Sequence, residues 1–347
     1  MLSLDETKKF NRQIKLEGFG VLSQEKLKSS KVLLVGLGGL GCPAALYLAA
    51  AGVGTIGLVE FDKVDSSNLA RQILFAADDV GLDKVEIAKE KLNKINSNIN
   101  ILAFNERLIK ENVNSIFKEF NLIVDGTDNF ETRYLINDAC VKMNLPLIHG
   151  SVSGFDGMVS LFNSKSISPC FRCLHPVMPN VSNSCAEIGV LATVTGIIGI
   201  QMAHECIKLI TGCGETLDGR VLLFRRNNFE TLNLSKDPDC PVCGNGVIIE
   251  KKPSFNELSR SEFEKIKEDF ILLDIRETFE FAERNLGGIN MPYSTFDIKK
   301  LEHLKNKEII LVCYSGEKSK IVIELLQKNS FQKLYNLKGG IREAVLH

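Results

Sequence analysis

The sequence lacks net charge: 42 Lys and Arg residues stand against 43 Asp and Glu residues, which leaves a formal charge of -1. This balance removes any compositional reason to expect nucleic acid or an anionic membrane as the main partner. The first 30 residues also lack the charged and then apolar pattern of a secretory leader. We therefore expect a cytoplasmic protein whose ten cysteines serve metal binding or catalysis rather than disulfides.

Long apolar runs are also missing. The most apolar stretch, residues 190–200, is interrupted by Thr and Gly, and it is shorter than the roughly 20 residues that a spanning helix needs. No low-complexity tract or internal repeat is apparent. With 347 residues, of which 44% are hydrophobic, the chain is long for one domain and can build two buried cores.

A strand–turn–helix–strand unit is predicted near the N-terminus. An apolar run at residues 31–35 ends in a glycine cluster at residues 36–41. An Ala-rich helical stretch at residues 42–51 and a second apolar run at residues 55–59 follow. This order of elements is typical of a βαβ unit.

Later apolar runs extend this unit into a sheet. Those that alternate with helical patterns predict a doubly wound parallel sheet; they lie at residues 100–104, 122–124 and 145–149. Residues 157–162 and 220–226 have the pattern of antiparallel strands, so the sheet is predicted to be mixed at that end.

A second, smaller α/β domain is predicted beyond a break at residues 244–253. Residues 270–274 and 309–313 there have the composition of buried strands and are accompanied by helical stretches. We place a first domain, a linker and a second domain at residues 1–245, 246–254 and 255–347.

The glycine cluster is a candidate phosphate site. Glycines after a first strand let backbone amides approach a phosphate, and the following helix N-terminus adds partial positive charge. Gly38, Gly39 and Gly41 are the candidates, and Glu60 with nearby Asp62 follows the second strand, where a carboxylate can accept from a ribose hydroxyl. Because most such loops bind dinucleotides in redox enzymes, the loop alone also permits a nicotinamide or flavin oxidoreductase.

Cations and a carboxylate favour nucleotidyl transfer instead. The cations Arg71 and Lys84 follow the acidic turn, and Asn68 lies shortly before Arg71. The carboxylate of Asp128, followed by Asn129, comes after a later strand, where ligands of open α/β sheets bind. Arg and Lys stabilise charge on phosphates while an Asp holds magnesium, and a redox enzyme needs no such set.

These stretches resemble the adenylation domain of the MoeB/ThiF family, relatives of the ubiquitin-activating enzymes. The resemblance rests on residues 36–41, 67–72 and 125–129 and runs from residue 10 to residue 243. It implies a Rossmann-like fold, ATP and magnesium, and a homodimer in which Arg12 reaches the phosphates of the neighbouring subunit. It also implies that a set of residues binds the nucleotide: Gly39, Glu60, Asn68, Arg71, Lys84, Asp128 and Asn129. Of these, Arg71 and Asp128 would also be catalytic. The family usually has Asp in place of Glu60.

Two C-x-x-C pairs are candidate metal ligands. Cys170 with Cys173 and Cys240 with Cys243 match the ligand set of a tetrahedral structural zinc ion. Because the pairs are far apart in the sequence, the metal would join distant segments. A single pair would equally suit a redox C-x-x-C at a helix start. Both pairs match the MoeB/ThiF pattern, which favours zinc.

Cys185 is a candidate nucleophile. It lies in a polar loop directly before the apolar stretch at residues 190–200, and a thiol near a helix N-terminus ionises more readily. An inert core cysteine is the ordinary alternative. The loop resembles the one that carries the conjugating cysteine in the MoeB/ThiF family, and both a thioester and an acyl disulfide stay open as its intermediate. The remaining cysteines of the first domain are expected to be structural: Cys42, Cys140, Cys206 and Cys213.

Cys313 follows a buried strand and begins a turn into a helix, where successive backbone amides can stabilise an anion or a persulfide. Residues 313–319 resemble the active-site loop of rhodaneses, and other segments resemble the rest of that fold: residues 274–277, 288–292 and 339–341. The resemblance implies a rhodanese-like domain with Cys313 as the catalytic residue. Lys318 replaces the commoner Arg, and the usual His-Ile pair before Gly288 is absent, so a domain used only for docking stays open.

The combined resemblance implies an ATP-dependent adenylyltransferase that activates the C-terminal carboxylate of a small ubiquitin-like sulfur carrier. A persulfide on Cys313, loaded by a donor such as a cysteine desulfurase, would then deliver sulfur to form a thiocarboxylate. Carriers of molybdopterin, thiamine and tRNA-thiolation pathways stay open. An oxidoreductase and a non-catalytic binding module are the alternatives, and the first leaves Arg71, Asp128 and the cysteine pairs unexplained.

Overall fold

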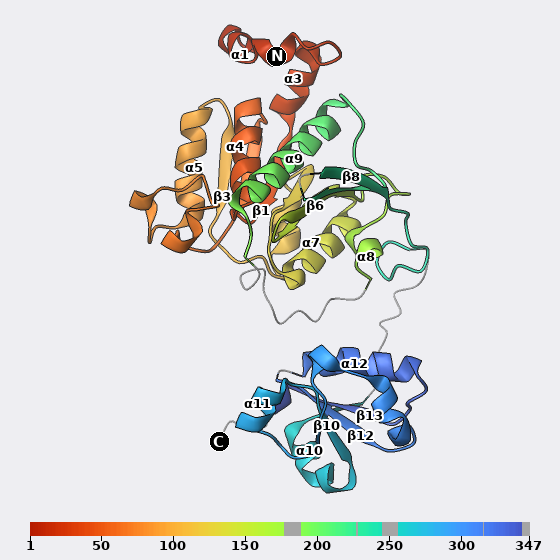
Figure 1. Ribbon diagram of the computed structural model, residues 1–347. Coiled ribbons are helices and arrows are strands. Elements are labelled where there is room, and N and C mark those ends of the chain that lie inside the picture. The colour runs from red at the N-terminus through yellow and green to blue at the C-terminus, as the bar shows by residue number, and fades with distance from the viewer. Residues whose placement is uncertain (177–188, 227, 245–255, 315, 342–347) are drawn as a thin grey trace. The chain divides into compact units, whose positions relative to one another are not determined.

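The chain folds into two compact units, seen in the computed structural model of Figure 1. The structure describes residues 1–176, 189–226, 228–244, 256–314 and 316–341. Most of residues 1–249 form the first unit, and most of residues 250–347 form the second. The predicted linker at residues 246–254 lies outside the described residues, so the domain boundaries stay a prediction. In the described ranges, no helix combines the length and the apolar character that crossing a membrane requires.

An eight-stranded mixed sheet is the centre of the first unit, with the strand order β3-β2-β1-β4-β5-β6-β7-β8. The first five strands in this order pair in parallel, and the last three pair antiparallel. The strands are β1 (Lys31–Val35), β2 (Thr55–Val59), β3 (Asn100–Phe104), β4 (Leu122–Asp125), β5 (Leu147–Ser153), β6 (Asp156–Phe162), β7 (Arg220–Arg225) and β8 (Asn228–Asn233). The predicted doubly wound mixed sheet is confirmed; the exposed edge strand β8 was not predicted, because its six residues have no buried face.

Helices cover both faces of this sheet. In β1, Val32 and Leu34 point into one apolar core, and Leu33 and Val35 point into the other. This alternation is the period of a strand that is buried on both sides. The first core includes α4 (Gly41–Ala51), α5 (Lys84–Ile95) and α9 (Ala192–Thr211), which lie side by side in Figure 1, and the second includes α6 (Val113–Phe117), α7 (Phe130–Met143) and α8 (Phe171–Leu174).

Close packing of α9 on the sheet brings a late segment of the chain to the early strands. Gly150 of β5 makes this possible, because a Cβ atom there would lie 2.3 Å from the sulfur of Met202 on α9. The same helix packs along α4. The N-terminus of α9 therefore lies beside the glycine turn that precedes α4.

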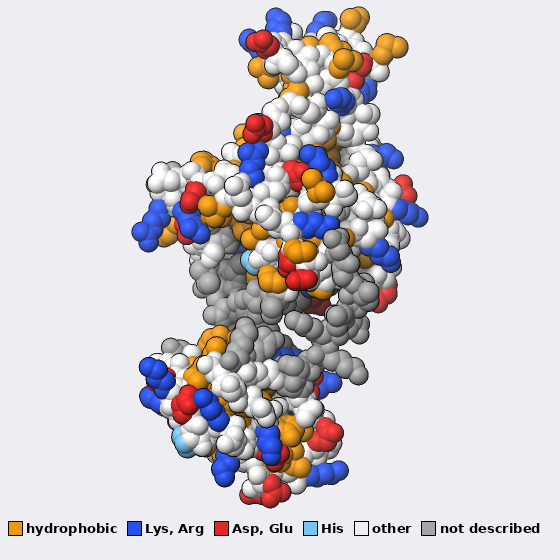
Figure 2. Space-filling model, turned by 90° about the vertical axis from the view of Figure 1, so that its right-hand side faces the viewer, with side chains coloured by type: hydrophobic (Ala, Val, Ile, Leu, Met, Phe, Trp, Pro, Cys, Tyr) orange, Lys and Arg blue, Asp and Glu red, His pale blue; other side chains and the backbone are white. Residues whose placement is uncertain are grey.

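Three N-terminal helices lie at one end of the unit (Figure 1): α1 (Leu4–Lys9), α2 (Asn11–Ile14) and α3 (Gly20–Ser29). Figure 2 shows apolar side chains grouped on this part of the surface. Leu4, Leu16 and Leu22 are among the exposed ones, with 82%, 59% and 75% of their side chains exposed. Two short 3-10 helices complete the unit, Ser66–Asn68 and Ala77–Asp79.

The second unit has a five-stranded, entirely parallel sheet in the order β11-β10-β12-β13-β9. Its strands are β9 (Asn256–Leu258), β10 (Ile271–Asp274), β11 (Ile289–Asn290), β12 (Ile309–Val312) and β13 (Leu334–Leu337). Its α-helices are α10 (Arg260–Ile266), α11 (Thr278–Glu283) and α12 (Glu317–Lys328), and its 3-10 helices are Lys267–Asp269, Tyr293–Thr295 and Ile298–Leu304. Buried side chains form a core on each face of this sheet, as the predicted small α/β domain requires.

Candidate functional site

A pocket of about 690 Å³ opens at the carboxyl ends of β1, β2 and β4. Its lining comes mainly from the loops that follow β1, β2, β3 and β4 and from the N-terminal ends of α5, α7 and α9. Nine of the predicted nucleotide-site residues line it: Gly38, Gly39, Glu60, Asp62, Asn68, Arg71, Lys84, Asp128 and Asn129. Arg12 and Gly41 do not belong to this lining.

The glycines of the turn have different roles. Gly36 has a φ of +89°, and a Cβ atom on it would lie 3.2 Å from the backbone of Gly126 after β4. A Cβ atom on Gly41 would lie 1.9 Å from the carbonyl oxygen of Gly36, so this position lets the turn close. A Cβ atom on Gly38 would meet nothing within 4 Å, because this residue faces the pocket. The first two positions shape the loop, and Gly38 leaves space for a ligand.

The carboxylate of Glu60 is held by backbone amides at the head of the pocket. Its Oε2 accepts from the amide of Leu37 at 2.9 Å, and its Oε1 accepts from the amides of Phe61 and Asp62 at 2.9 and 3.0 Å. The residue is buried. Oε1 already accepts two hydrogen bonds, whereas Oε2 accepts one, so Oε2 can still accept a hydrogen bond from a ligand hydroxyl.

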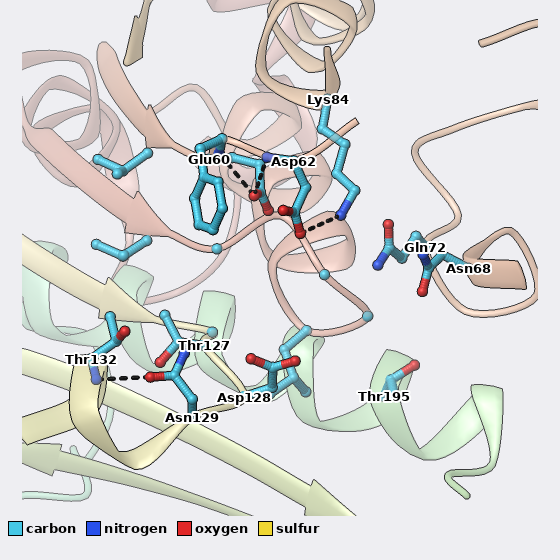
Figure 3. Close-up of a pocket in the computed structure, with 18 of the residues that line it drawn as sticks. Glu60, Asp62, Asn68, Gln72, Lys84, Thr127, Asp128, Asn129, Thr132 and Thr195 are labelled. Carbon is cyan, nitrogen blue, oxygen red and sulfur yellow. Dashed lines mark hydrogen bonds and ion pairs between the residues drawn. The ribbon is translucent and has the colours of Figure 1, made fainter. Parts of the chain in front are cut away.

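Two cations are fixed on one side of the pocket. Lys84, the first residue of α5, is buried, and its Nζ lies 3.3 Å from Oδ2 of the exposed Asp62 (Figure 3). The guanidinium of Arg71 donates to the side-chain oxygen of Asn68 at 2.6 Å. Both cations are therefore oriented by neighbours that also line the pocket.

Asp128 and Asn129 lie on the other side, in the turn between β4 and α7. Figure 3 shows the carboxylate of Asp128 directed into the pocket. Asn129 is the N-cap of α7, and its side-chain oxygen accepts from the amide of Thr132 at 2.9 Å. An N-cap of this kind stabilises the helix start, so Asn129 also orients the turn that carries Asp128.

Several lining residues were not predicted. Gln72 and Thr127 stand inside stretches that were already recognised, and Gln72 is buried with a side-chain oxygen that has no partner among the described residues. Arg133 lies one helical turn after Asn129 and donates to the carbonyl of Thr127 at 2.7 Å, a position that helical spacing could have suggested. Thr195 carries no sequence signal, because only the packing of α9 brings it to Gly39.

The four predicted metal ligands come together. The sulfur atoms of Cys170, Cys173, Cys240 and Cys243 all lie within 4.8 Å of one another. A tetrahedral ion with Zn–S bonds of about 2.3 Å requires sulfur separations of about 3.8 Å. The Cys170–Cys240 and Cys173–Cys243 sulfur distances are 3.6 and 3.4 Å. The cluster could therefore hold a metal ion that joins the α8 segment to residues 240–243.

The charges of this cluster also fit a cation. Hydrogen bonding with Cys170, aided by the amide of Asp237, lowers the pKa of Cys173 to about 5. The same sulfur contact raises the pKa of Cys170, and burial raises that of Cys243 to about 12. One thiolate thus forms readily, but further thiolates at this distance repel one another unless a positive ion lies between them.

Cys313 lies between β12 and α12, as predicted, and is buried. Its Sγ is 3.5 Å from the hydroxyl oxygen of Ser319. A Cβ atom on Gly340 would lie 2.3 Å from the carbonyl oxygen of Cys313, so the predicted glycine segment packs directly against the cysteine loop. Tyr293 is also near this loop, with Nζ of Lys318 5.8 Å from its ring centre.

The remaining cysteines differ in environment. Burial raises the pKa of Cys42 to about 12 and those of Cys140 and Cys206 well above the ordinary value, which agrees with inert thiols. Cys213 is only partly buried. Cys185 lies outside the described residues, so its role as a nucleophile stays a prediction.

Comparison with known proteins identifies the family. Residues 10–242 match the ThiF family, and residues 259–346 match the rhodanese-like domain. The chain therefore belongs to the ThiF family and carries a C-terminal rhodanese-like domain. The predicted resemblance and both parts of the predicted fold class are confirmed.

Two of the similar relatives have the same name. "Adenylyltransferase and sulfurtransferase MOCS3" of Drosophila sechellia is 38% identical over 378 residues, which cover 98% of this chain and 83% of that protein. The protein of the same name from Culex quinquefasciatus is 43% identical over 255 residues, which cover 72% of this chain and 58% of that protein.

Solved structures match about two thirds of this chain. The E. coli protein MccB in complex with MccA-N7isoASN has a TM-score of 0.58 and 28% identity, covering 65% of this chain and 70% of that chain. MccB with ATP has a TM-score of 0.56 and 27% identity, covering 65% and 69%. The use of ATP fits the family.

The two kinds of glycine should respond differently to substitution. We expect Gly41→Ala to lower the free energy of unfolding of the first unit by about 1–3 kcal/mol, because the new Cβ atom forces the turn apart. Gly38→Ala should unfold like the parent but bind ATP more weakly, because its methyl group enters the pocket. Thermal unfolding and nucleotide titration measure the two effects. Equal losses of stability in both variants would contradict this assignment.

Proposed function

We propose that the first unit uses ATP to adenylate the C-terminal carboxylate of a small ubiquitin-like sulfur carrier. The carrier's carboxylate oxygen attacks the α-phosphorus of ATP, and pyrophosphate leaves. The observation that carries the proposal is the convergence of Lys84, Arg71 and Asp128 around a pocket headed by the glycine turn. Two cations and a carboxylate suit a triphosphate with its metal, and such fixed charges stabilise the charge that develops in the transition state.

Magnesium is the metal ion that this pocket suits, and Asp128 is its proposed protein ligand. Carboxylates and phosphate oxygens are the ligands that magnesium prefers. Asp128 is exposed in the pocket and faces the side that Lys84 occupies (Figure 3). Glu60 would accept from the ribose, because its three amide donors hold it at the end of β2. The proposed site residues are Gly38, Gly39, Gly41, Glu60, Asp62, Asn68, Arg71, Lys84, Asp128 and Asn129.

A homodimer would complete the pocket. Arg12 lies on α2, is exposed, and does not line the pocket of its own chain. We infer that Arg12 of the partner subunit reaches the phosphates. The exposed apolar side chains of the N-terminal helices, grouped on the surface in Figure 2, support this, because a dimer that used the segment carrying Arg12 would bury them.

Zinc is the proposed occupant of the cysteine cluster. Four thiolate donors at near-tetrahedral separations form a closed shell with no position for a substrate, so the ion would be structural. It would tie α8 to the segment at residues 240–243.

The second unit would supply the sulfur. We propose that a donor such as a cysteine desulfurase loads Cys313 with a persulfide, whose terminal sulfur replaces AMP on the activated carboxylate. This step forms an acyl disulfide on Cys313. Cys185 is the proposed second thiol: it would attack the Cys313 sulfur and release the carrier as a thiocarboxylate, and a thiol reductant would then return the resulting disulfide to two thiols. Cytoplasmic residence is proposed with this chemistry, because the thiols must stay reduced.

Carrier-dependent ATP–pyrophosphate exchange tests the adenylation step. Candidate carriers of the molybdopterin, thiamine and tRNA-thiolation type are supplied in turn. We expect Lys84→Met to lower the exchange rate by about 100-fold, because a charge on the triphosphate loses its counterion while the apolar stem is kept. Lys94→Met is the matched control on the same helix, since that side chain is exposed and pairs with the exposed Glu90. Hydride transfer to a nicotinamide, together with no exchange for any carrier, would overturn the proposal.

Persulfide trapping tests the sulfur step. We expect the parent, incubated with thiosulfate, to yield an alkylated persulfide on Cys313, identified by mass spectrometry. Cys313→Ala should lose this product and thiocarboxylate formation, while its exchange activity stays that of the parent. Cys213→Ala, which removes a partly exposed thiol of the first unit, is the control. Thiocarboxylate formation by Cys313→Ala at the parent's rate would remove Cys313 as donor.

Metal analysis tests the zinc site. We expect about one zinc ion per chain, because the four thiolates form one closed shell. Cys240→Ser should lose the metal and lower the unfolding temperature of the first unit by about 5 °C or more. Cys213→Ser should change neither. Full stability and no metal in the parent after growth with zinc would argue against the site.

A further inference from the structure

A buried histidine lies directly beneath the turn that carries Asp128. His149 on β5 is paired in register with Asp125, the last residue of β4. Both side chains are 1% exposed, and Nδ1 of His149 lies 2.7 Å from Oδ2 of Asp125. Neither residue lines the pocket. Any effect of the pair on the pocket must therefore pass through the groups that Asp125 contacts.

Asp125 holds the pocket turn through its second oxygen. Its Oδ1 accepts from the backbone amide of Thr127 at 2.9 Å and from the Thr127 hydroxyl at 2.6 Å. The carbonyl of Thr127 in turn accepts from Nε and Nη2 of Arg133 at 3.2 and 2.7 Å. Thr127, Asp128 and Arg133 all line the pocket. A continuous set of hydrogen bonds thus runs from His149 to the residue next to Asp128.

The environment of the imidazole determines its protonation. Burial lowers the pKa of His149 and outweighs the attraction of Asp125. Burial raises the pKa of Asp125, but the hydrogen bonds from His149 and Thr127 and the charge of Arg133 bring it below its ordinary value. A neutral imidazole that donates from Nδ1 to a carboxylate satisfies both groups.

The other side of the imidazole is apolar. Its Nε2 has no hydrogen-bond partner among the described residues. The ring packs on Phe171, with ring centres 4.8 Å apart, and on Phe162, at 6.3 Å. A proton on Nε2 would be buried without an acceptor, so these contacts keep the proton on Nδ1, where Asp125 accepts it.

We propose that His149 is a positioning residue for adenylation: by donating to Asp125 it fixes the Thr127–Asp128 turn and, through it, the magnesium and phosphate end of the pocket. The inference rests on the proposed function. A side chain that only filled the core would change the amount of folded protein. A positioning residue changes the rate and the magnesium dependence of each folded molecule.

Three substitutions separate these roles. His149→Leu removes the donor and keeps apolar volume, whereas His149→Asn keeps a donor near the place of Nδ1. His175→Leu is the matched control, because this imidazole also packs on Phe171, with ring centres 4.9 Å apart, but makes no hydrogen bond to Asp125 among the described residues. Carrier-dependent ATP–pyrophosphate exchange is measured per active site, counted by nucleotide titration, at varied magnesium concentrations.

We expect His149→Leu to lower kcat per active site, or to raise the half-saturating magnesium concentration, by about 10- to 100-fold, as loss of an outer hydrogen-bond partner does. His149→Asn should recover most of the loss, and His175→Leu should match the parent. If His149→Leu does not fold, Thr127→Val is the deciding variant, because it removes one donor to Asp125 and leaves the aromatic packing intact. Thr127→Val should then show the same shift in magnesium dependence.

The outcomes are distinct. Parent-like kcat and magnesium dependence in His149→Leu, or in Thr127→Val where the former is unfolded, overturn the inference and leave the proposed function standing. Equal losses in His149→Leu and His149→Asn also overturn it, because the donor would then not matter. Absence of carrier-dependent exchange in the parent overturns the proposed function and, with it, the inference.

Discussion

The pairing of β1 with β2 on one side and with β4 on the other is the constraint on which the nucleotide pocket depends. From β1 the chain runs first to β2, then crosses to β4, so the loops after β1 and β4 leave the sheet edge in opposite directions. A crevice forms at such a point in every open α/β sheet. Here the backbone of Gly36 touches that of Gly126 where the two loops begin to separate.

The charged side chains around this crevice each come from the end of a different strand or helix. Glu60 ends β2, Lys84 begins α5, and Asp128 precedes α7. Opposite charges face each other across the pocket, and backbone amides or helix starts fix most of them. The pocket is thus organised before any ligand enters, which lowers the cost of orienting a triphosphate.

The antiparallel half of the sheet is connected to this pocket through β5. β5 belongs to both halves, since it pairs in parallel with β4 and antiparallel with β6. Its His149 contacts Asp125 on one side and Phe171 on the other, and Phe171 lies between two cysteines of the metal cluster. His149 and Phe171 therefore lie between the proposed metal cluster and the turn of the nucleotide pocket.

The second unit has its own cores and its own reactive residue. Asp274 and Arg276 form a buried ion pair at the end of β10, with Arg276 also donating to the carbonyl oxygens of Glu280 and Arg284. This pair fixes the turn after β10, which explains why residues 274–277 are recognisable from sequence. The cysteine loop is shaped by Gly340, from the far end of the unit.

Local chemistry determined much of this protein in advance. The bounds of β1, β2 and β3 agree with the apolar runs of the sequence, and contiguous stretches already contained Glu60, Arg71 and Asp128. The cysteine pairs predicted a metal cluster because thiols at that spacing have few other uses. Only the tertiary structure decided that Thr195 lies beside Gly39 and that His149 contacts Asp125, which holds the pocket turn. The physical reason is that these contacts join strands and helices far apart in the chain, and no local pattern records which of them pack together.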